Sequence, residues 1–228
     1  MGFPDLQDRV GQIRGFIAER QRLARLDHPV CIVAVTKGHG PEAVRAAAAA
    51  GLTVVGENRV QEALPKQDRT RELTVEWDLV GTLQRNKARQ VAGRFRLIHS
   101  VDRLDLAAEL DRRTDETRRQ RILVQVNCSG EPQKGGVEPS ALPSLLDGLR
   151  GMHRLEVAGL MTMAALTDDV GEQRRAFALL QQLSQRAVSR GQAGPELSMG
   201  MSGDYLVAVE EGATIVRLGT LLFGERSP

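Results

Sequence analysis

The sequence runs Val30-Cys31-Ile32-Val33-Ala34-Val35-Thr36-Lys37 near its start, and this stretch predicts a buried strand. Its apolar character is continuous, which is typical of a parallel sheet covered by helices. Lys37 ends the strand, and only four of the 31 basic residues are lysines (Lys37, Lys66, Lys87 and Lys134). Partial burial at a strand end favours the neutral amine, the form of lysine that attacks an aldehyde to form a Schiff base.

Further short apolar runs follow this strand, and segments of helical character separate them. They lie at residues 53–55, 77–80, 97–98, 122–126, 157–163, 197–199 and 214–216. With the run before Lys37 this makes eight strand candidates. Eight strand–helix units favour a closed barrel over an open doubly wound sheet. We therefore predict an α/β fold, a (β/α)₈ TIM barrel.

An additional helix is expected before the first strand, because Leu6, Val10, Ile13 and Ile17 recur at helical spacing. No linker, repeat or low-complexity segment divides the chain. We therefore expect residues 1–228 to form a single domain.

Aspartates mark the expected starts of two later helices. Asp102 is placed to cap a helix that follows the fourth strand, and Asp168 or Asp169 to cap one that follows the sixth.

The composition excludes several classes of protein. The net charge is only +2, so no coherent nucleic-acid surface is expected. Cys31 and Cys128 have neither a disulfide framework nor metal-ligand spacing, and the four histidines show none either, so no metal is expected. No apolar stretch approaches the roughly 18 residues of a membrane span, and no signal peptide is evident. We expect a cytoplasmic protein that binds neither nucleic acid nor membrane.

Candidate ligand-binding residues gather where the strands end, which is where such barrels bind their ligands. Asn58 follows the second strand; it can either contact a ligand or cap the next helix, and the residues alone do not decide between the two. Glycine-rich loops follow the seventh and eighth strands, at residues 198–203 and 217–220. Their backbone N–H groups, with the hydroxyls of Ser202 and Thr220, predict a phosphate site.

Arg217 ends the last strand, which adjoins the first strand and Lys37 in a closed barrel. Arginine can only donate hydrogen bonds, so facing a pyridine nitrogen it would keep that nitrogen unprotonated. An ion pair with Glu225 or another carboxylate is the simpler interpretation of this residue taken alone.

These segments resemble the pyridoxal phosphate homeostasis proteins, whose fold is that of the N-terminal barrel of alanine racemase. The resemblance covers nearly the whole chain. It rests on Ala34-Val35-Thr36-Lys37 and on residues 56–62, which begin Gly56-Glu57-Asn58. It rests further on residues 81–87, 98–102, 126–131, 159–163, 197–202 and 216–220.

The resemblance implies a pyridoxal 5′-phosphate (PLP) site. It implies that Lys37 holds PLP as an internal aldimine and that Arg217 faces the pyridine nitrogen. It further implies phosphate-binding residues, which are Ser202, Gly219 and Thr220, and ring-contacting residues, which are Asn58 and Met161.

Three departures from the usual family pattern concern the rim of the site. Asp78 stands where the family usually has histidine, and Arg59 where it usually has tyrosine. Residues 38–41 also differ from the more usual basic residue and proline after the lysine.

Two functions remain in view, and a third explains less. The first is PLP homeostasis without turnover, in which the protein holds the cofactor, buffers it and delivers it to apo-forms of PLP-dependent enzymes; we expect a monomer with no catalytic residue. The alternative is a PLP-dependent amino-acid racemase, which needs an acid or base on each face of the cofactor. Tyr205, the one tyrosine, is expected to pack or to begin a helix, and the chain ends soon after the barrel. A phosphosugar enzyme would leave Lys37 without a role.

Two further residues carry weaker expectations. Lys134 lies in a glycine-flanked loop on the same rim, and we put forward a transient role in capturing PLP, with a mobile surface lysine as the favoured alternative. His99 is expected to make an ordinary hydrogen bond at the end of its strand, and no function is assigned to it.

Overall fold

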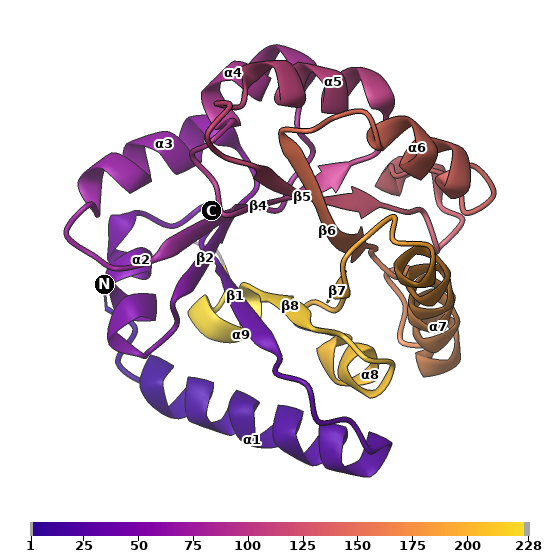
Figure 1. Cartoon of the computed structure of the whole chain (residues 1–228). Helices are drawn as coiled ribbons and strands as arrows, with labels where there is room; N and C mark the ends of the chain where they lie inside the picture. Colours follow the sequence, from indigo (N-terminus) through magenta and orange to yellow (C-terminus); the bar gives the residue numbers. More distant parts are fainter. Residues whose placement is uncertain (1, 226–228) are drawn as a thin grey trace.

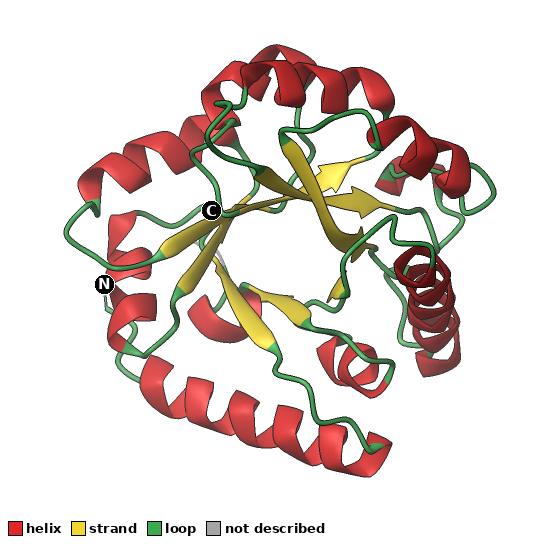
Figure 2. Cartoon of the chain, in the orientation of Figure 1, coloured by secondary structure: helices red, strands yellow, loops and turns green. Residues whose placement is uncertain are grey.

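Eight parallel strands close into a barrel in the computed structural model, which describes residues 2–225. The strands form the inner ring and the helices surround them (Figure 1, Figure 2). The predicted (β/α)₈ barrel is thereby confirmed. The strands are β1 (Cys31–Val35), β2 (Val54–Glu57), β3 (Glu76–Leu79), β4 (Leu97–Val101), β5 (Gln120–Gln125), β6 (Leu155–Met161), β7 (Glu196–Ser198) and β8 (Ile215–Leu218).

Helices follow the strands around the outside of the barrel. Two of the connections also contain short 3₁₀ turns, η1 (Arg85–Lys87) and η2 (Pro132–Lys134). The α-helices are α1 (Leu6–Ala24), α2 (Pro41–Ala49), α3 (Val60–Arg69), α4 (Ala88–Val91), α5 (Leu104–Arg113), α6 (Leu142–Leu149), α7 (Val170–Ser189), α8 (Tyr205–Glu210) and α9 (Thr220–Phe223). None of the helices in the described residues is both long enough and apolar enough to cross a bilayer.

The barrel closes between its first and last strands. In the β1–β8 ladder Cys31 pairs with Ile215 and Ala34 with Leu218. This closure places the end of β8 beside Lys37, as the eight-strand prediction required.

The strands alternate between two apolar layers because successive side chains point to opposite faces. One cluster fills the inside of the barrel and includes Val33, Val35, Leu97 and Met161. The other lies between the strands and the helices. A strand residue that lies two positions from one of these inner side chains therefore also points into the barrel.

The predicted N-terminal helix is α1, and it buries Leu6, Val10, Ile13 and Ile17 as expected. It lies outside β1 and β8 and contacts α8 and α9 (Figure 1). The guanidinium of Arg9 donates to the Leu222 carbonyl oxygen at 2.6 Å, so the helix is bonded to the last turn of the fold.

The two helix-start predictions have different outcomes. Asp169 caps α7, and its carboxylate accepts from the backbone N–H groups of Gly171 and Glu172. The prediction for Asp102 is wrong, because α5 has Arg103 at its N-cap and no side chain caps it. Asp102 instead pairs with the Arg103 guanidinium at 2.7 Å.

Candidate functional site

A cavity of about 670 Å³ opens at the carboxyl ends of the strands. Loops that follow β1, β2, β3, β6, β7 and β8 line it, together with residues from the end of β5 and from η2. This is the end of the barrel at which the sequence placed the ligand.

Six of the seven predicted site residues line this one cavity. They are Lys37, Asn58, Ser202, Arg217, Gly219 and Thr220. The seventh, Met161, is buried in the inner apolar cluster and does not line the cavity, whereas Met163 does.

Lys37 and Asn58 come from neighbouring strands, β1 and β2, whose ladder pairs Val35 with Gly56. Two positions beyond the inward-pointing Val35, Lys37 is half-buried at the cavity wall. The helix-capping alternative for Asn58 is wrong, because Arg59 is the N-cap of α3 and no side chain caps that helix. The backbone of Gly81 packs closely against that of Asn58, because a Cβ at Gly81 would lie 2.2 Å from the Asn58 carbonyl oxygen.

The two glycine-rich loops are bonded to each other at the cavity. The Ser202 hydroxyl accepts from the backbone N–H of Leu221 at 3.1 Å, which connects the loop after β7 to α9. Gly203 and Thr220 line the cavity, and among the described residues no group accepts from their backbone N–H. Unpaired N–H groups at a cavity wall are suited to phosphate oxygens.

Arg217 is buried and points from β8 into the cavity wall. Its Nη1 donates to the Ser198 hydroxyl at 2.6 Å and its Nη2 to the Thr162 carbonyl oxygen at 3.0 Å. Within residues 2–225 no carboxylate lies within ion-pair distance of it, so the proposed pair with Glu225 is wrong. Burial lowers the pKa of Arg217 to about 10, and Asp204 opposes this shift.

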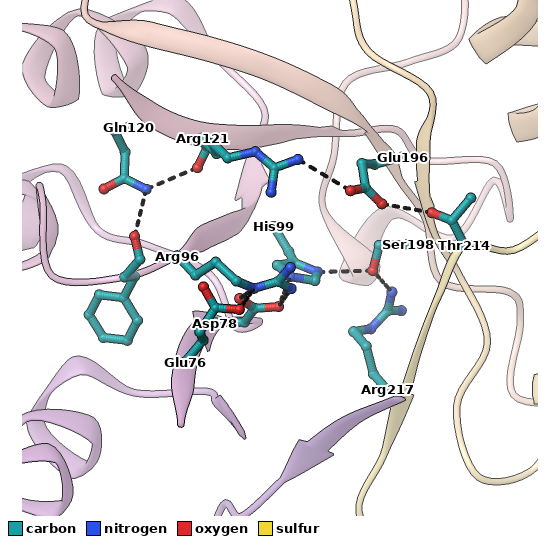
Figure 3. Close-up of polar contacts among 11 residues, drawn as sticks. Glu76, Asp78, Arg96, His99, Gln120, Arg121, Glu196, Ser198, Thr214 and Arg217 are labelled. Carbon is teal, nitrogen blue, oxygen red and sulfur yellow. Dashed lines mark hydrogen bonds and ion pairs between the residues drawn. The ribbon is translucent and has the colours of Figure 1, made fainter. Parts of the chain in front are cut away.

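A set of polar side chains, all buried except the half-buried Arg96, continues from Arg217 through the inside of the barrel (Figure 3). We call it the barrel network, and it consists of Arg96, Asp78, His99, Ser198 and Arg217. His99 lies 2.9 Å from Ser198 through Nδ1 and 3.0 Å from Asp78 through Nε2. Arg96 binds both carboxylate oxygens of Asp78, at 2.8 and 2.5 Å. His99 therefore does more than make the strand-end bond that the sequence predicted.

Burial and neighbouring charges both act on the pKa values of His99 and Asp78. Burial lowers the pKa of His99, although the neighbouring Asp78 carboxylate acts in the opposite direction. Burial alone would raise the pKa of Asp78, but its bonds to His99 and Arg96 outweigh burial and lower it. The network therefore holds an ionised aspartate next to a neutral histidine.

Lys134 is not the mobile surface lysine that was favoured. Its side chain is only 18% exposed, and its amine pairs with Glu131 at 2.9 Å and donates to the carbonyl oxygen of Ala164. It lines the cavity together with Asp204, a buried carboxyl whose pKa is raised by burial.

A buried lysine, Lys66, lies behind the cavity wall, and the sequence did not predict a role for it. Its amine donates to the Thr36 carbonyl oxygen at 2.8 Å and to Glu57 at 2.5 Å. The Thr36 hydroxyl also donates to Glu57 at 2.6 Å. This cluster fixes the backbone immediately before Lys37.

The remaining departures from the family pattern lie at the rim. The Arg59 side chain is 76% exposed and makes only a 3.5 Å contact with Glu62. The His39 ring lies 5.7 Å from the ring of Phe3 and 5.5 Å from that of Phe223. These contacts hold the loop after Lys37 against both ends of the fold. No group of histidine, cysteine or acidic side chains in the described residues could hold a metal.

Comparison with known proteins identifies the family. The alanine racemase N-terminal domain family matches residues 17–227. A pyridoxal phosphate homeostasis protein of Aquifex aeolicus is 42% identical over 208 residues, which cover 90% of this chain and 91% of the relative. A second, from Pseudomonas aeruginosa, is 39% identical and covers 97% and 96% of the two chains. The chain belongs to the pyridoxal phosphate homeostasis protein family.

Solved structures agree with the membership in this homeostasis protein family. PipY of Synechococcus elongatus, solved with PLP bound, is 37% identical, with a TM-score of 0.85 over 96% of this chain and all of that chain. An alanine racemase from Clostridium difficile has a TM-score of 0.77 at 14% identity, and the match covers all of this chain and 58% of the racemase. The second likeness concerns the fold alone.

Proposed function

We propose that this protein binds PLP in the cavity at the carboxyl ends of the strands and acts in PLP homeostasis. In this proposal the neutral amine of Lys37 would condense with the aldehyde of the cofactor to a Schiff base, and the aldehyde oxygen would leave as water. The cofactor is held for buffering and delivery, and the protein does not turn over a substrate.

One observation carries the proposal: a lysine, an arginine and two glycine-rich loops converge on a single cavity. Lys37 follows β1 and Arg217 lies on the adjacent strand β8, and both line the cavity, so both can reach one small ring. PipY was solved with PLP bound, and its match to this chain covers the whole PipY chain. This likeness supports PLP as the ligand of the cavity.

Each polar group around the cavity suits one part of PLP. The unpaired N–H groups of Gly203 and Thr220, with the Ser202 hydroxyl, would bind the phosphate. Arg217 uses Nη1 and Nη2 for protein acceptors and still has N–H groups left for a ring nitrogen. Asn58 would contact the ring, and Met161 would support it from the inner cluster.

The decisive measurement is the visible absorbance of the purified protein with added PLP, before and after borohydride reduction. Wild type is expected to absorb in the visible range and to retain the cofactor covalently after reduction. Lys37→Ala should lose both properties. Lys87→Ala is the matched control, because Lys87 follows β3 but does not line the cavity, and it should behave as wild type. A colourless wild type would contradict the proposal.

Racemase activity is the alternative, and it needs a second acid or base at the cavity. Tyr205 begins α8, is buried and does not line the cavity. Asp204 and Lys134 do line the cavity, but each is already bonded within the protein, Asp204 to the Met201 N–H and Lys134 to Glu131. We propose that exchange of the α-proton of amino acids with solvent deuterium is absent in the PLP-loaded protein. Rapid exchange, lost in Lys37→Ala, would favour the racemase.

We further propose that residues 1–228 work as one domain and as a cytoplasmic monomer that passes PLP to apo-enzymes. Sedimentation of the loaded protein tests the monomer, and transfer of PLP to an apo-transaminase tests delivery. A stable dimer would argue against the monomer. PLP release that is no faster with the apo-transaminase than without it would argue against delivery.

A further inference from the structure

The barrel network begins at Arg96, directly before β4, and ends at Arg217, which lines the cavity at the carboxyl ends of the strands. Figure 3 shows its members. Asp78, His99 and Ser198 are fully buried, each on an inward-facing strand position. Polar groups at such depth are costly unless every one of them is hydrogen-bonded. This requirement determines which atom donates at each step of the network.

The assignment begins at Arg96, which can only donate. It donates through Nε and Nη2 to the two oxygens of Asp78, and an ionised carboxylate can only accept. The Nε2 of His99, 3.0 Å from the same carboxylate, must therefore carry a hydrogen. A neutral imidazole has one N–H, so Nδ1 of His99 is an acceptor.

Ser198 transmits this polarity to Arg217. Its hydroxyl donates to Nδ1 of His99 at 2.9 Å, which leaves its oxygen to accept from Nη1 of Arg217 at 2.6 Å. The Thr162 carbonyl oxygen takes Nη2 at 3.0 Å. Two acceptors on two different nitrogens fix the plane of the guanidinium.

We propose that Asp78 is a positioning residue for Arg217, acting through the tautomer of His99 and the hydroxyl of Ser198. The locked guanidinium presents its remaining N–H groups to the cavity. The consequence for PLP, a fixed donor at the ring nitrogen, rests on the proposed function. The orientation of Arg217 itself does not.

The substitution Asp78→Leu tests the tautomer directly. One carboxylate oxygen, Oδ2, accepts both from Nη2 of Arg96 and from Nε2 of His99. Leucine offers no acceptor there, so the imidazole hydrogen should move to Nδ1, where the Ser198 oxygen can accept it. That hydrogen would then compete with Arg217 for the Ser198 oxygen.

Glu76→Leu is the matched control. Glu76 lies on the same strand, 3.9 Å from the Nε of Arg96, and its side chain is 62% exposed. It undergoes the same change from carboxylate to apolar side chain, but it makes no contact with His99.

Two measurements by nitrogen NMR on the ligand-free protein decide the proposal. The tautomer of His99 should be Nε2–H in wild type and Glu76→Leu, and Nδ1–H in Asp78→Leu. Rotation of the Arg217 guanidinium should be about tenfold faster in Asp78→Leu, as expected for one lost hydrogen bond. Ser198→Ala should keep the Nε2–H tautomer and free Arg217 equally, and the double variant should be no faster than either single one.

A third measurement uses PLP labelled with ¹⁵N in its ring. Asp78→Leu and Ser198→Ala should shift the ring nitrogen signal toward that of a pyridine without a donor, and should weaken PLP binding about tenfold. An unchanged tautomer in Asp78→Leu, or unchanged Arg217 rotation, would overturn the proposal. If Asp78→Leu does not fold, unchanged rotation in Ser198→Ala overturns it. Failure of wild type to bind PLP would defeat the proposed function, while the ligand-free measurements would still decide the network.

Discussion

Lys37 is held at the cavity wall by residues that do not touch the cavity themselves. Lys66 and Glu57 form a buried ion pair behind it, with side chains 9% and 0% exposed. The pair shares its bonds with the backbone and hydroxyl of Thr36, the residue before Lys37. One oxygen of Glu57 has no hydrogen-bond partner among the described residues, so this carboxylate depends on few donors.

Lys66→Met is expected to destabilise the protein by about 3–5 kcal/mol, because it leaves the Glu57 charge buried without a cation. Urea unfolding measures the loss. The double variant Glu57→Gln/Lys66→Met removes both charges and should lose clearly less than Lys66→Met alone. Equal losses in the two proteins would show that packing, and not the unpaired charge, sets the cost.

His99 gives the stability a dependence on pH. Its pKa is lowered from 6.5 in the folded state, so below about pH 6.5 the unfolded chain binds a proton that the folded protein excludes. The free energy of unfolding should therefore fall as the pH drops, by up to about 1.4 kcal/mol per unit, until the folded pKa is reached.

Urea unfolding of His99→Gln between pH 7.5 and 5 tests this dependence. The variant lacks the titrating group, so the slope should be shallower than in wild type whatever its absolute stability. His153→Gln replaces an exposed histidine and should retain the wild-type slope. A wild-type slope in His99→Gln would contradict the assignment.

The sequence placed residues at the cavity where a motif marks the end of a strand, and it missed contacts that depend on a pair of side chains. Lys37, Arg217 and Thr220 each end a strand or begin a turn, so their place follows from the strand pattern. The link from His99 to Asp78 joins two strands whose register the sequence does not contain. The one signal was a charged residue, Asp78, inside an apolar run.

At the scale of elements, the loop between β7 and α8 depends on one glycine. Gly200 has φ +91°, and a Cβ there would lie 2.6 Å from the Cβ of Ala208. Gly203 lies in the same loop with open space around it. The loop therefore has no room for a side chain at Gly200 but has room for one at Gly203.

Gly200→Ala should cost about 1–2 kcal/mol from its backbone conformation alone, and more from the contact with α8. It should also weaken PLP binding, because Ser202 moves with the loop. Gly203→Ala should change stability by less than about 0.5 kcal/mol. Thermal unfolding and a PLP titration of both variants provide the measurement, and equal effects of the two would contradict it.

Element boundaries show why local signals differ in value. Asp169 caps α7 because its side chain reaches the first free N–H groups of that helix. Asp102 has the same chemistry but pairs with Arg103, and α5 begins without a side-chain cap. The sequence did not show that the Arg103 charge would compete for Asp102, and this is why one cap was predicted correctly and the other was not.

At the scale of the whole molecule, Lys134 brings η2 to the loop after β6 across the cavity. Its amine bonds the Ala164 carbonyl oxygen, so the lysine sits at the rim through which a ligand would leave. Lys134→Ala is expected to slow PLP transfer to an apo-enzyme while leaving the absorbance of the loaded protein unchanged. An unchanged transfer rate would remove Lys134 from any role in delivery.

The pairing of β1 with β8 has a consequence for the order of events in the cell. Lys37 and Arg217 are brought to one cavity only when the last strand docks on the first, so a polypeptide still under synthesis has half a site. Loading with PLP must then follow barrel closure and cannot guide it. Because the ligand would bind only the closed barrel, it would stabilise that state by mass action, by about 2.7 kcal/mol at a hundredfold excess over Kd. The stability of newly made protein, and with it the protein's lifetime, would thus rise with the free PLP concentration.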